Sequence, residues 1–280
     1  MEKAPQSKMR PFPRLAYVAR ANRAIAGHPY EGIERVLERI TERRDRRRAP
    51  WPYVASQACE EQVHAQIGEP WPCKEHDGFD DVWDGALAEL EASGIHVGRG
   101  TFGGWDDGDP KLARVAWCLT RHLRPARVVE TGVGHGLTTR VLLEALERSG
   151  RGHLWSIDLP PLLEHRFADE TGVAVPERLR KRWTLLHGSS RRRLPALLAS
   201  LRQVDLFLHD SMHTTRNLRF ELDRVWPALA PGGAVLIDDV DKNVATGQFV
   251  EAHPGVPCVM ARSEDGQAMI GCVVKPGSFP

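Results

Sequence analysis

Three glycines at alternate positions follow an apolar run in Val128-Val-Glu-Thr-Gly-Val-Gly-His-Gly136. Glycine adopts backbone angles that other residues avoid, so this loop can turn sharply and let a ligand approach the main chain. The following residues have a helical pattern, and the amino end of a helix offers free N–H groups. A dinucleotide fingerprint requires Gly-x-Gly-x-x-Gly, whereas position 137 is Leu. The segment predicts a ligand-binding strand-to-helix loop and disfavours a nicotinamide enzyme; a plain tight turn is the alternative.

A carboxylate ends the next apolar run, His153-Leu-Trp-Ser-Ile-Asp158. Asp158 lies 22 residues after Gly136, the separation at which an acid after the second strand of a nucleotide-binding unit reaches ribose hydroxyls. A lone Asp at a strand end also caps turns. Together with the glycine loop, Asp158 favours a site for a cofactor that contains ribose.

Three more acids follow two later apolar runs: Asp210 after one, and Asp238 and Asp239 after the other. If these runs are neighbouring parallel strands, their ends lie about one inter-strand spacing of ~4.8 Å apart. Carboxylates that converge repel one another unless a cation neutralises them. Oxygen ligands suit Mg²⁺ or Mn²⁺, so the acids predict a divalent metal site. Exposed caps at strand ends are the alternative.

These motifs need a scaffold that brings strand ends to one edge of a sheet. We expect helices over 111–123, 136–148, 190–201, 215–229 and 244–252, between strands at Ala126–Glu130, His153–Ile157, Trp183–Leu186, Val204–Leu208, Ala234–Ile237, Cys258–Ala261 and Met269–Val274. Short apolar strands that alternate with helices predict an α/β fold, a Rossmann-like, seven-stranded, mostly parallel sheet with helices on both faces. Ligands bind at the carboxyl edge of such a sheet. The short connection between the last two strands predicts an antiparallel hairpin.

The first third of the chain has a different, helical pattern. Apolar spacing predicts helices over 13–26, 31–47, 53–67 and 80–92, and one stripe of the second helix consists of Ile33, Val36, Leu37 and Ile40. The turn-rich residues 97–110 either cover a ligand or only connect elements. We therefore divide the chain into a helical N-terminal extension, residues 1–94, that forms a lid or an oligomer contact, and an α/β domain, residues 95–280.

The ordered set of strand-end motifs resembles one enzyme family. Glu130-Thr-Gly-Val-Gly-His-Gly136, Asp158, Leu208-His-Asp-Ser-Met-His213 and Pro231-Gly-Gly-Ala-Val-Leu-Ile-Asp-Asp239 resemble class I S-adenosylmethionine-dependent methyltransferases over residues 95–275. Within them the chain looks most like metal-dependent small-molecule O-methyltransferases of the macrocin and mycinamicin sugar type. The resemblance implies methyl transfer from S-adenosylmethionine to a hydroxyl of a small molecule, such as a sugar or a glycosylated natural product, with Mg²⁺ or Mn²⁺ assistance.

The resemblance also implies roles for single residues. The glycine loop would hold the methionine half of the cofactor, Asp158 the ribose, and Ser189, after the third strand, the adenine. The implied cofactor-binding residues are Glu130, Gly132, Gly134, Gly136, Asp158 and Ser189. The implied metal ligands are Asp210, Asp238 and Asp239, of which Asp210 would also be catalytic.

His213 lies three residues beyond Asp210, beside the predicted metal and opposite the sulfonium. Methyl transfer to a hydroxyl is an in-line displacement in which the hydroxyl loses a proton. A histidine with a pKa near neutrality can take that proton while a metal lowers the pKa of the alcohol. The sugar O-methyltransferases that the chain resembles have a base at this place. We predict His213 as the general base and His209 as a packing or supporting residue.

The charge distribution leaves an alternative. Residues 1–50 carry 13 Lys+Arg against 6 Asp+Glu, so an RNA methyltransferase could use the basic leading helices. The net charge of +1 does not favour nucleic acid as a partner. A nicotinamide oxidoreductase and a catalytically silent scaffold are further alternatives.

Localisation and thiol chemistry rest on simpler features. No apolar run of 18 residues and no secretory signal are present, so we expect no membrane partner. The five scattered cysteines fit reduced thiols of a cytoplasmic protein, in which a homo-oligomer is possible. Soft metal ligands occur at Cys59, His64, Cys73 and His76, but Cys59-x4-His64 lacks the tight spacing of structural zinc sites.

Overall fold

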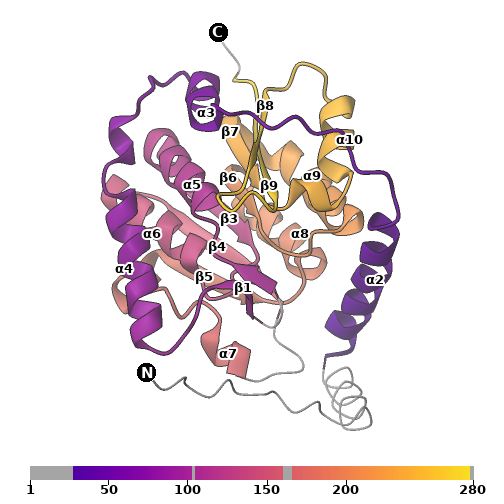
Figure 1. Cartoon of the computed structure of the whole chain (residues 1–280), viewed down its shortest axis with the longest axis horizontal. Helices are drawn as coiled ribbons and strands as arrows, with labels where there is room; N and C mark the ends of the chain where they lie inside the picture. The colour runs from indigo at the N-terminus through magenta and orange to yellow at the C-terminus, as the bar shows by residue number, and fades with distance from the viewer. Residues whose placement is uncertain (1–27, 103–104, 160–165, 278–280) are drawn as a thin grey trace, which may run out of the picture.

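The computed structural model describes residues 28–102, 105–159 and 166–277. Seven strands form one sheet in the order β5-β4-β3-β6-β7-β9-β8 (Figure 1). They are β3 (Arg127–Thr131), β4 (His153–Asp158), β5 (Trp183–His187), β6 (Val204–His209), β7 (Leu229–Ile237), β8 (Cys258–Arg262) and β9 (Met269–Val274). β3 to β7 pair in parallel, whereas β9 runs antiparallel to both β7 and β8. The predicted Rossmann-like, mostly parallel sheet with its antiparallel edge hairpin is confirmed.

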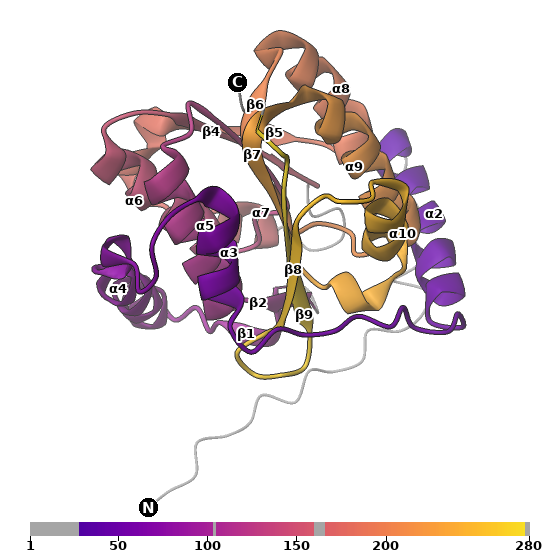
Figure 2. The ribbon, with the colours of Figure 1, turned by 90° about the horizontal axis from the view of Figure 1, so that it is seen from above.

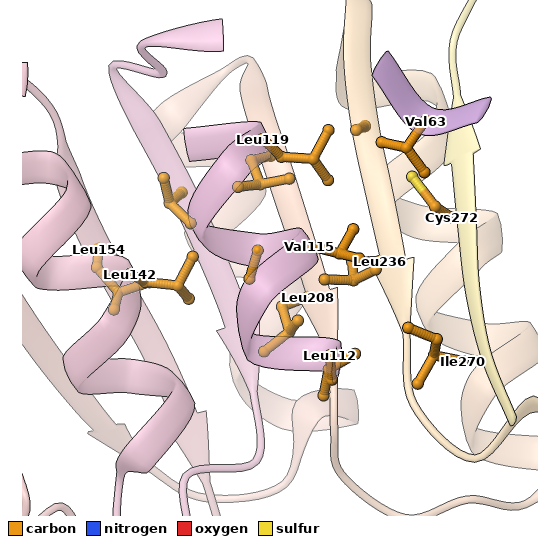
Figure 3. Close-up of a cluster of buried hydrophobic side chains, with 14 of the residues drawn as sticks. Val63, Leu112, Val115, Leu119, Leu142, Leu154, Leu208, Leu236, Ile270 and Cys272 are labelled. Carbon is orange, nitrogen blue, oxygen red and sulfur yellow. The ribbon is translucent and has the colours of Figure 1, made fainter. Parts of the chain in front are cut away.

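Helices cover both faces of the sheet (Figure 2). One face carries α5 (Pro110–Leu123) and α6 (Leu137–Ser149), and the other carries α8 (Ser190–Leu201), α9 (Thr215–Ala228) and α10 (Ala245–Ala252). Leu112, Val115 and Leu119 recur at three- and four-residue spacing on α5, so they share the face that packs over the strands (Figure 3). Each face thus has its own buried apolar layer, and the two layers hold the strand ends in place.

The order of the strands creates a crevice at the carboxyl edge. β3 pairs with β4 on one side and with β6 on the other, so that Thr131 lies opposite both Ile157 and His209. Strands β3, β4 and β5 follow one another toward one edge of the sheet, and the next strand in the chain, β6, lies on the other side of β3. Ligands bind where the strand order reverses in this way. The glycine loop, Asp158 and Asp210 all follow strands at this edge.

The N-terminal region is helical, as predicted. It contains α2 (Pro29–Asp45), α3 (Cys59–Ile67), a 3-10 helix (Lys74–His76) and α4 (Phe79–Ala92). α2 lies beside α9, whereas α3 and α4 lie on the side of α5 and α6 (Figure 2). The helix expected over 13–26 lies outside the described residues. The helix expected over 53–67 begins only at Cys59, because the preceding residues are extended and Ser56 donates its N–H to the Met260 carbonyl at 2.7 Å.

The orientation of α2 is unusual for an amphipathic helix. Its apolar stripe faces outward, with Ile33 58% exposed and Val36 52% exposed. Its acidic side chains face inward instead, where Glu31 accepts from Arg192 Nη1 at 2.6 Å and Glu34 from Arg216 Nη1 at 2.8 Å. The helix is therefore attached to the α/β domain by ion pairs rather than by an apolar core.

Several short elements were not predicted from the sequence. The turn-rich residues 97–110 contain a hairpin of β1 (Gly98–Phe102) and β2 (Trp105–Asp107). The others are α7 (Arg166–Glu170) and the 3-10 helices Lys74–His76, Glu177–Arg182 and Val240–Lys242, all too short for a periodic signal. Among the described helices, none combines the length and the apolar character needed to cross a membrane.

Candidate active site

The three glycines of the loop after β3 all have left-handed backbone angles, with φ of 88° at Gly132, 55° at Gly134 and 89° at Gly136. A β-carbon at Gly132 would lie 1.7 Å from the carbonyl oxygen of Asp210. One at Gly136 would lie 2.9 Å from the α-carbon of Gly172. The atoms nearest to a β-carbon at Gly134 would be those of the Asp107 carboxylate, at 3.5 Å. The outer glycines are therefore required by neighbouring backbone. The Gly134 main chain holds the loop in shape, because its carbonyl accepts from the Gly172 N–H at 2.9 Å and its N–H donates to the Asp158 carboxylate.

Glu130 lies beneath this loop rather than at its surface. Its side chain is 1% exposed, and Oε2 accepts hydrogen bonds from Thr139 Oγ1 at 2.8 Å and Ser156 Oγ at 2.6 Å. Burial raises the pKa of Glu130 to about 7, although both hydroxyls act in the opposite direction. These bonds connect β3 with β4 and α6, so the acid supports the shape of the loop.

The ends of β4 and β5 place Asp158 and Ser189 at adjoining positions. Gly188 donates its N–H to the Asp158 carbonyl at 2.8 Å. The Asp158 carboxylate accepts from the backbone N–H groups of Leu159 and Gly134, and burial raises its pKa to about 7, partly offset by Arg35 of α2. Ser189 is 5% exposed, and its hydroxyl oxygen is buried without a hydrogen-bond partner among the described residues. A carboxylate and a hydroxyl at this edge suit the hydroxyls and ring nitrogens of a nucleoside.

The hairpin β1–β2 brings an additional acid, Asp107, onto the glycine loop. Asp107 Oδ2 lies 3.1 Å from the backbone nitrogen of His135 and 2.5 Å from its Nδ1. The His135 side chain is buried, and its ring packs edge-on against Phe102 with centroids 4.9 Å apart. The turn-rich pattern of this stretch predicts a loop that covers a ligand or connects elements, but it does not single out Asp107. The only sequence feature that could have indicated Asp107 is an acidic residue inside a turn-rich segment.

Asp210, Asp238 and Asp239 lie at the ends of the adjacent strands β6 and β7. Asp210 donates its N–H to the Thr131 carbonyl at 2.8 Å, and Asp238 donates its N–H to the His209 carbonyl at 2.9 Å. The side chains of Asp210 and Asp238 are hydrogen-bonded to each other. Burial, together with the neighbouring negative charges, raises the pKa of both carboxyl groups well above the usual range. Such a pair is stabilised by sharing a proton or by binding a cation.

His213 joins this acidic group. Its Nε2 lies 3.9 Å from Asp210 Oδ1 and 3.8 Å from Asp239 Oδ2. Its Nδ1 is buried and has no hydrogen-bond partner in the part of the chain that the structure describes. Ligand atoms of Asp210, His213 and Asp238 all lie within 4.8 Å of one another. The imidazole therefore faces the acids directly.

The pKa of His213 differs from the near-neutral value expected from the sequence. Burial lowers the pKa to about 4, and the Asp239 carboxylate offsets only part of this effect. Burial penalises the charged imidazolium, so the ring is neutral at pH 7. A neutral imidazole can accept a proton, and it can equally serve as a metal ligand.

Glu221 organises the loop that carries these groups, and the sequence analysis did not find it. This fully buried carboxylate on α9 accepts from Thr131 Oγ1 at 2.8 Å and pairs with His209 Nδ1 at 2.7 Å. Burial alone would raise the pKa of Glu221, but His209 and the hydrogen bonds hold it below its usual value. His209 thus has the predicted supporting role, and its ring lies edge-on to His213 with centroids 5.6 Å apart. A lone acid on the apolar face of α9 was the available signal.

The extension helix α2 fixes the other end of the same loop. Asp45 accepts from the backbone N–H of Thr215 and from its hydroxyl, both at 2.8 Å. Glu38 accepts from the hydroxyl of Thr214. Carboxylates at the amino end of a helix are favourable because the N–H groups there have no other partner. The loop between β6 and α9 is therefore held by the sheet, by Glu221 and by the extension.

The donor set of this edge fits a divalent cation. Half-buried carboxylates that lie against one another are the arrangement that a cation neutralises, and oxygen ligands suit Mg²⁺ or Mn²⁺. The candidate ligands are Asp210, Asp238 and Asp239, and the geometry adds His213.

Comparison with known families gives one match, over part of the chain. A family model described as a methyltransferase domain matches residues 129–240, which span the glycine loop to the end of the acidic group. A search of curated protein sequences finds no match.

Solved structures share the fold. An O-methyltransferase from Bacillus cereus, in complex with SAH, has a TM-score of 0.54 and 16% identity, and the match covers 76% of this chain and 97% of that one. TomG from Streptomyces achromogenes, an O-methyltransferase involved in tomaymycin synthesis and in complex with SAM, has a TM-score of 0.51 and 16% identity, covering 71% and 91%. A putative O-methyltransferase from Klebsiella pneumoniae has a TM-score of 0.50 and 18% identity, with the same coverage. At these identities the likeness establishes the fold.

Proposed function

We propose that the chain is a class I S-adenosylmethionine-dependent methyltransferase that transfers a methyl group to a hydroxyl of a small molecule. A methyltransferase-domain model matches residues 129–240, and a solved O-methyltransferase shares the fold, which supports the proposal. The observation that carries this proposal is the convergence, at one sheet edge, of the glycine loop, Asp158 and the group formed by Asp210, His213, Asp238 and Asp239. A cofactor site and an acidic site side by side are what a metal-assisted methyl transfer requires.

The proposed cofactor site follows the strand ends from β3 to β5. The glycine loop around Gly134 would lie against the methionine half, Asp158 would accept hydrogen bonds from the ribose hydroxyls, and the Ser189 hydroxyl, which has no partner among the described residues, would bond the adenine. Glu130, Gly132 and Gly136 would act by fixing the loop rather than by direct contact. The surrounding acids also suit a cofactor that carries a positive sulfonium.

The proposed metal site consists of Asp210, Asp238 and Asp239, with Asp210 close to the reaction. A bound Mg²⁺ or Mn²⁺ would lower the pKa of the acceptor hydroxyl and orient it toward the methyl group. The protein's own contribution is to hold the acids on two adjacent strands and to keep the loop between them rigid through Glu221. His213 is our candidate for the base that takes the hydroxyl proton.

We also propose the chemical class of the methyl acceptor. TomG acts in the synthesis of a small natural product, and we propose a natural-product hydroxyl, of a sugar or another small molecule, as the acceptor here. We further propose residues 1–94 as the extension that shapes the substrate side or contacts a second copy, because α2 touches the His213 loop and exposes an apolar stripe. All five cysteines are free thiols, which supports a reducing, cytoplasmic setting.

Calorimetry with S-adenosylhomocysteine tests the proposal at its first step. We expect micromolar binding, about −8 kcal/mol, and no competition by NADH. Turnover with a panel of hydroxylated sugars, macrolides and phenols should then require Mg²⁺ or Mn²⁺. Cofactor binding that is accompanied by tight, steeply salt-dependent RNA binding would favour the RNA methyltransferase instead. Absence of S-adenosylhomocysteine binding would refute the proposed function.

A further inference from the structure

A second cluster of metal-binding side chains lies between the extension and α5, away from the proposed active site. It contains His64 on α3, Cys73 just before the 3-10 helix, and Cys118 and His122 on α5. His122 is near the end of α5, and β3 begins at Arg127, so the cluster lies toward the amino edge of the sheet. The proposed active site is at the opposite, carboxyl edge. Figure 1 shows α3 near the top of the molecule and β1 well below it.

Three of the side chains converge, and His122 reaches one of them. The ligand atoms of His64, Cys73 and Cys118 all lie within 4.8 Å of one another. His122 Nε2 lies 2.9 Å from Cys73 Sγ. Cys118 and His122 are four residues apart on one helix, so they share a face. His64, Cys73 and Cys118 are 1%, 7% and 2% exposed, which closes the cluster to solvent.

A hydrogen bond at His64 and a carboxylate beside His122 leave the Nε2 atom of each imidazole for the cluster. His64 Nδ1 lies 2.6 Å from the backbone carbonyl of Glu60, which can only accept, so Nδ1 carries the proton. Nε2 of His64 then carries a lone pair, and it is buried with no hydrogen-bond partner among residues 28–102, 105–159 and 166–277. His122 Nδ1 lies 3.4 Å from Glu69 Oε2, which likewise leaves Nε2 for the cluster. Metal-binding histidines are held in this way by a carbonyl or a carboxylate on the far nitrogen.

We propose that His64, Cys73, Cys118 and His122 bind one structural zinc ion that ties the extension to the α/β domain. Two sulfurs and two imidazole nitrogens in a closed, buried cluster are the donor set of structural zinc sites. Ligand atoms about 2.0–2.3 Å from a tetrahedral ion lie about 3.3–3.8 Å apart. The upper limit of 4.8 Å between the ligand atoms of His64, Cys73 and Cys118 is close to that separation. Binding of Zn²⁺ releases the two thiol protons and forms two Zn–S and two Zn–N bonds, with no redox change.

This set differs from the soft ligands singled out in the sequence. Cys59 packs in the apolar layer with Val63 and Cys272, and His76 Nε2 lies 3.7 Å from Glu60 Oε2 instead. Cys118 and His122 replace them from a helix more than forty residues downstream of Cys73. Only folding brings α3 and α5 together, so the spacing along the chain could not reveal the cluster.

Elemental analysis of the purified full-length chain tests the proposal. After exhaustive dialysis against zinc-free buffer we expect one zinc per chain, retained in Asp210→Ala, which separates this site from the proposed active site. Cys73→Ser and Cys118→Ser should lose the zinc. Cys258→Ser and His76→Ala are matched controls that should keep it. Zinc absent from the wild-type chain, or lost equally in the controls, would overturn the proposal.

Two readouts on the wild-type chain cover the case in which the serine variants do not fold. Replacement of the metal by Co²⁺ should give the visible absorption of a tetrahedral cobalt–thiolate site, and an octahedral spectrum would contradict the proposal. Alkylation followed by peptide mapping should show Cys73 and Cys118 protected until a strong chelator is added. Equal reactivity of these thiols with and without chelator would also overturn it. Neither readout depends on methyltransferase activity.

Discussion

The backbone of Gly132 lies against the backbone of Asp210, so closely that a β-carbon at position 132 would be 1.7 Å from the Asp210 carbonyl oxygen. Asp210 donates its own N–H to Thr131, the residue before this glycine. The loop proposed to bind the cofactor and the first acid proposed to bind the metal are thus parts of one packed unit. A change in the glycine loop must therefore disturb both sites.

This contact predicts a large effect of Gly132→Ala. The variant combines left-handed strain with a backbone clash, so we expect a loss of at least about 3 kcal/mol in the free energy of unfolding. Gly232→Ala is the matched control, because Gly232 has a similar φ of 75° but nothing within 4 Å of an added β-carbon. It should cost only about 1–2 kcal/mol. Urea denaturation of both variants measures the difference, and equal costs would contradict the contact.

Asp158 offers a direct test of the cofactor site. Asp158→Ala should weaken S-adenosylhomocysteine binding by about 1.5–3 kcal/mol, because it removes hydrogen bonds to a charged group. Asp205→Ala is a poor control, since that carboxylate accepts the N–H groups of Ala126 and Arg127. The exposed Asp223 on α9 is suitable, and its alanine variant should bind normally. Calorimetry measures the affinity of each variant for S-adenosylhomocysteine. Undiminished affinity in Asp158→Ala would show that Asp158 is not part of the cofactor site.

Much of the fold could be predicted because strong local patterns determine it. Every predicted strand from β3 to β9 is present, since each is a short apolar run bounded by turn residues. The β1–β2 hairpin could not be predicted, because Gly98 and Gly100 sit in its first strand and hide any alternation. The outward orientation of the apolar stripe of α2 could not be predicted from the local sequence either, because it depends on ion pairs with Arg192 and Arg216, which lie on helices far along the chain.

In the candidate site, too, some residues could be predicted from the sequence and others could not. The strand-end acids Asp158 and Asp210 could be predicted, because parallel topology brings such positions to one edge. Asp107 and Glu221 could not, since their roles depend on a loop and a helix that fold back onto His135 and His209. The pKa of His213 likewise depends on burial, which no short motif encodes.

Glu130 predicts a pH dependence of stability. Burial raises its pKa to about 7 from 4.5, so the folded state binds the proton more tightly than the unfolded state. Its contribution is fully present below pH 4.5 and is lost as the pH rises through 7. In Glu130→Gln we expect the decline in the free energy of unfolding between pH 5 and 8 to be about 1–3 kcal/mol smaller than in the wild type. Urea denaturation at several pH values measures it; parallel pH curves for the two proteins would contradict the buried, protonated acid.

The acidic group predicts a metal requirement. Chelation should abolish turnover, and Mg²⁺ or Mn²⁺ should restore it. Asp210→Ala should not be rescued by added metal, whereas Asp239→Asn keeps an oxygen ligand and should retain part of the activity at high Mg²⁺. S-adenosylhomocysteine affinity should change little in either variant. Full turnover of the wild type after exhaustive chelation would rule the metal out.

His213 can act as a base or as a metal ligand, and the two roles predict different results. If it takes the hydroxyl proton, His213→Ala should lower turnover by about 10²–10⁴-fold. The affinity for Mn²⁺, measured by competition with Mg²⁺, should then stay the same, and so should the affinity for S-adenosylhomocysteine. If Nε2 binds the cation instead, Mn²⁺ affinity should fall together with turnover, and excess metal should restore part of the rate. The exposed His96 provides the control, since His96→Ala should change none of these quantities. A loss of less than tenfold in His213→Ala, with unchanged metal affinity, would mean that His213 only packs beside Asp210 and Asp239.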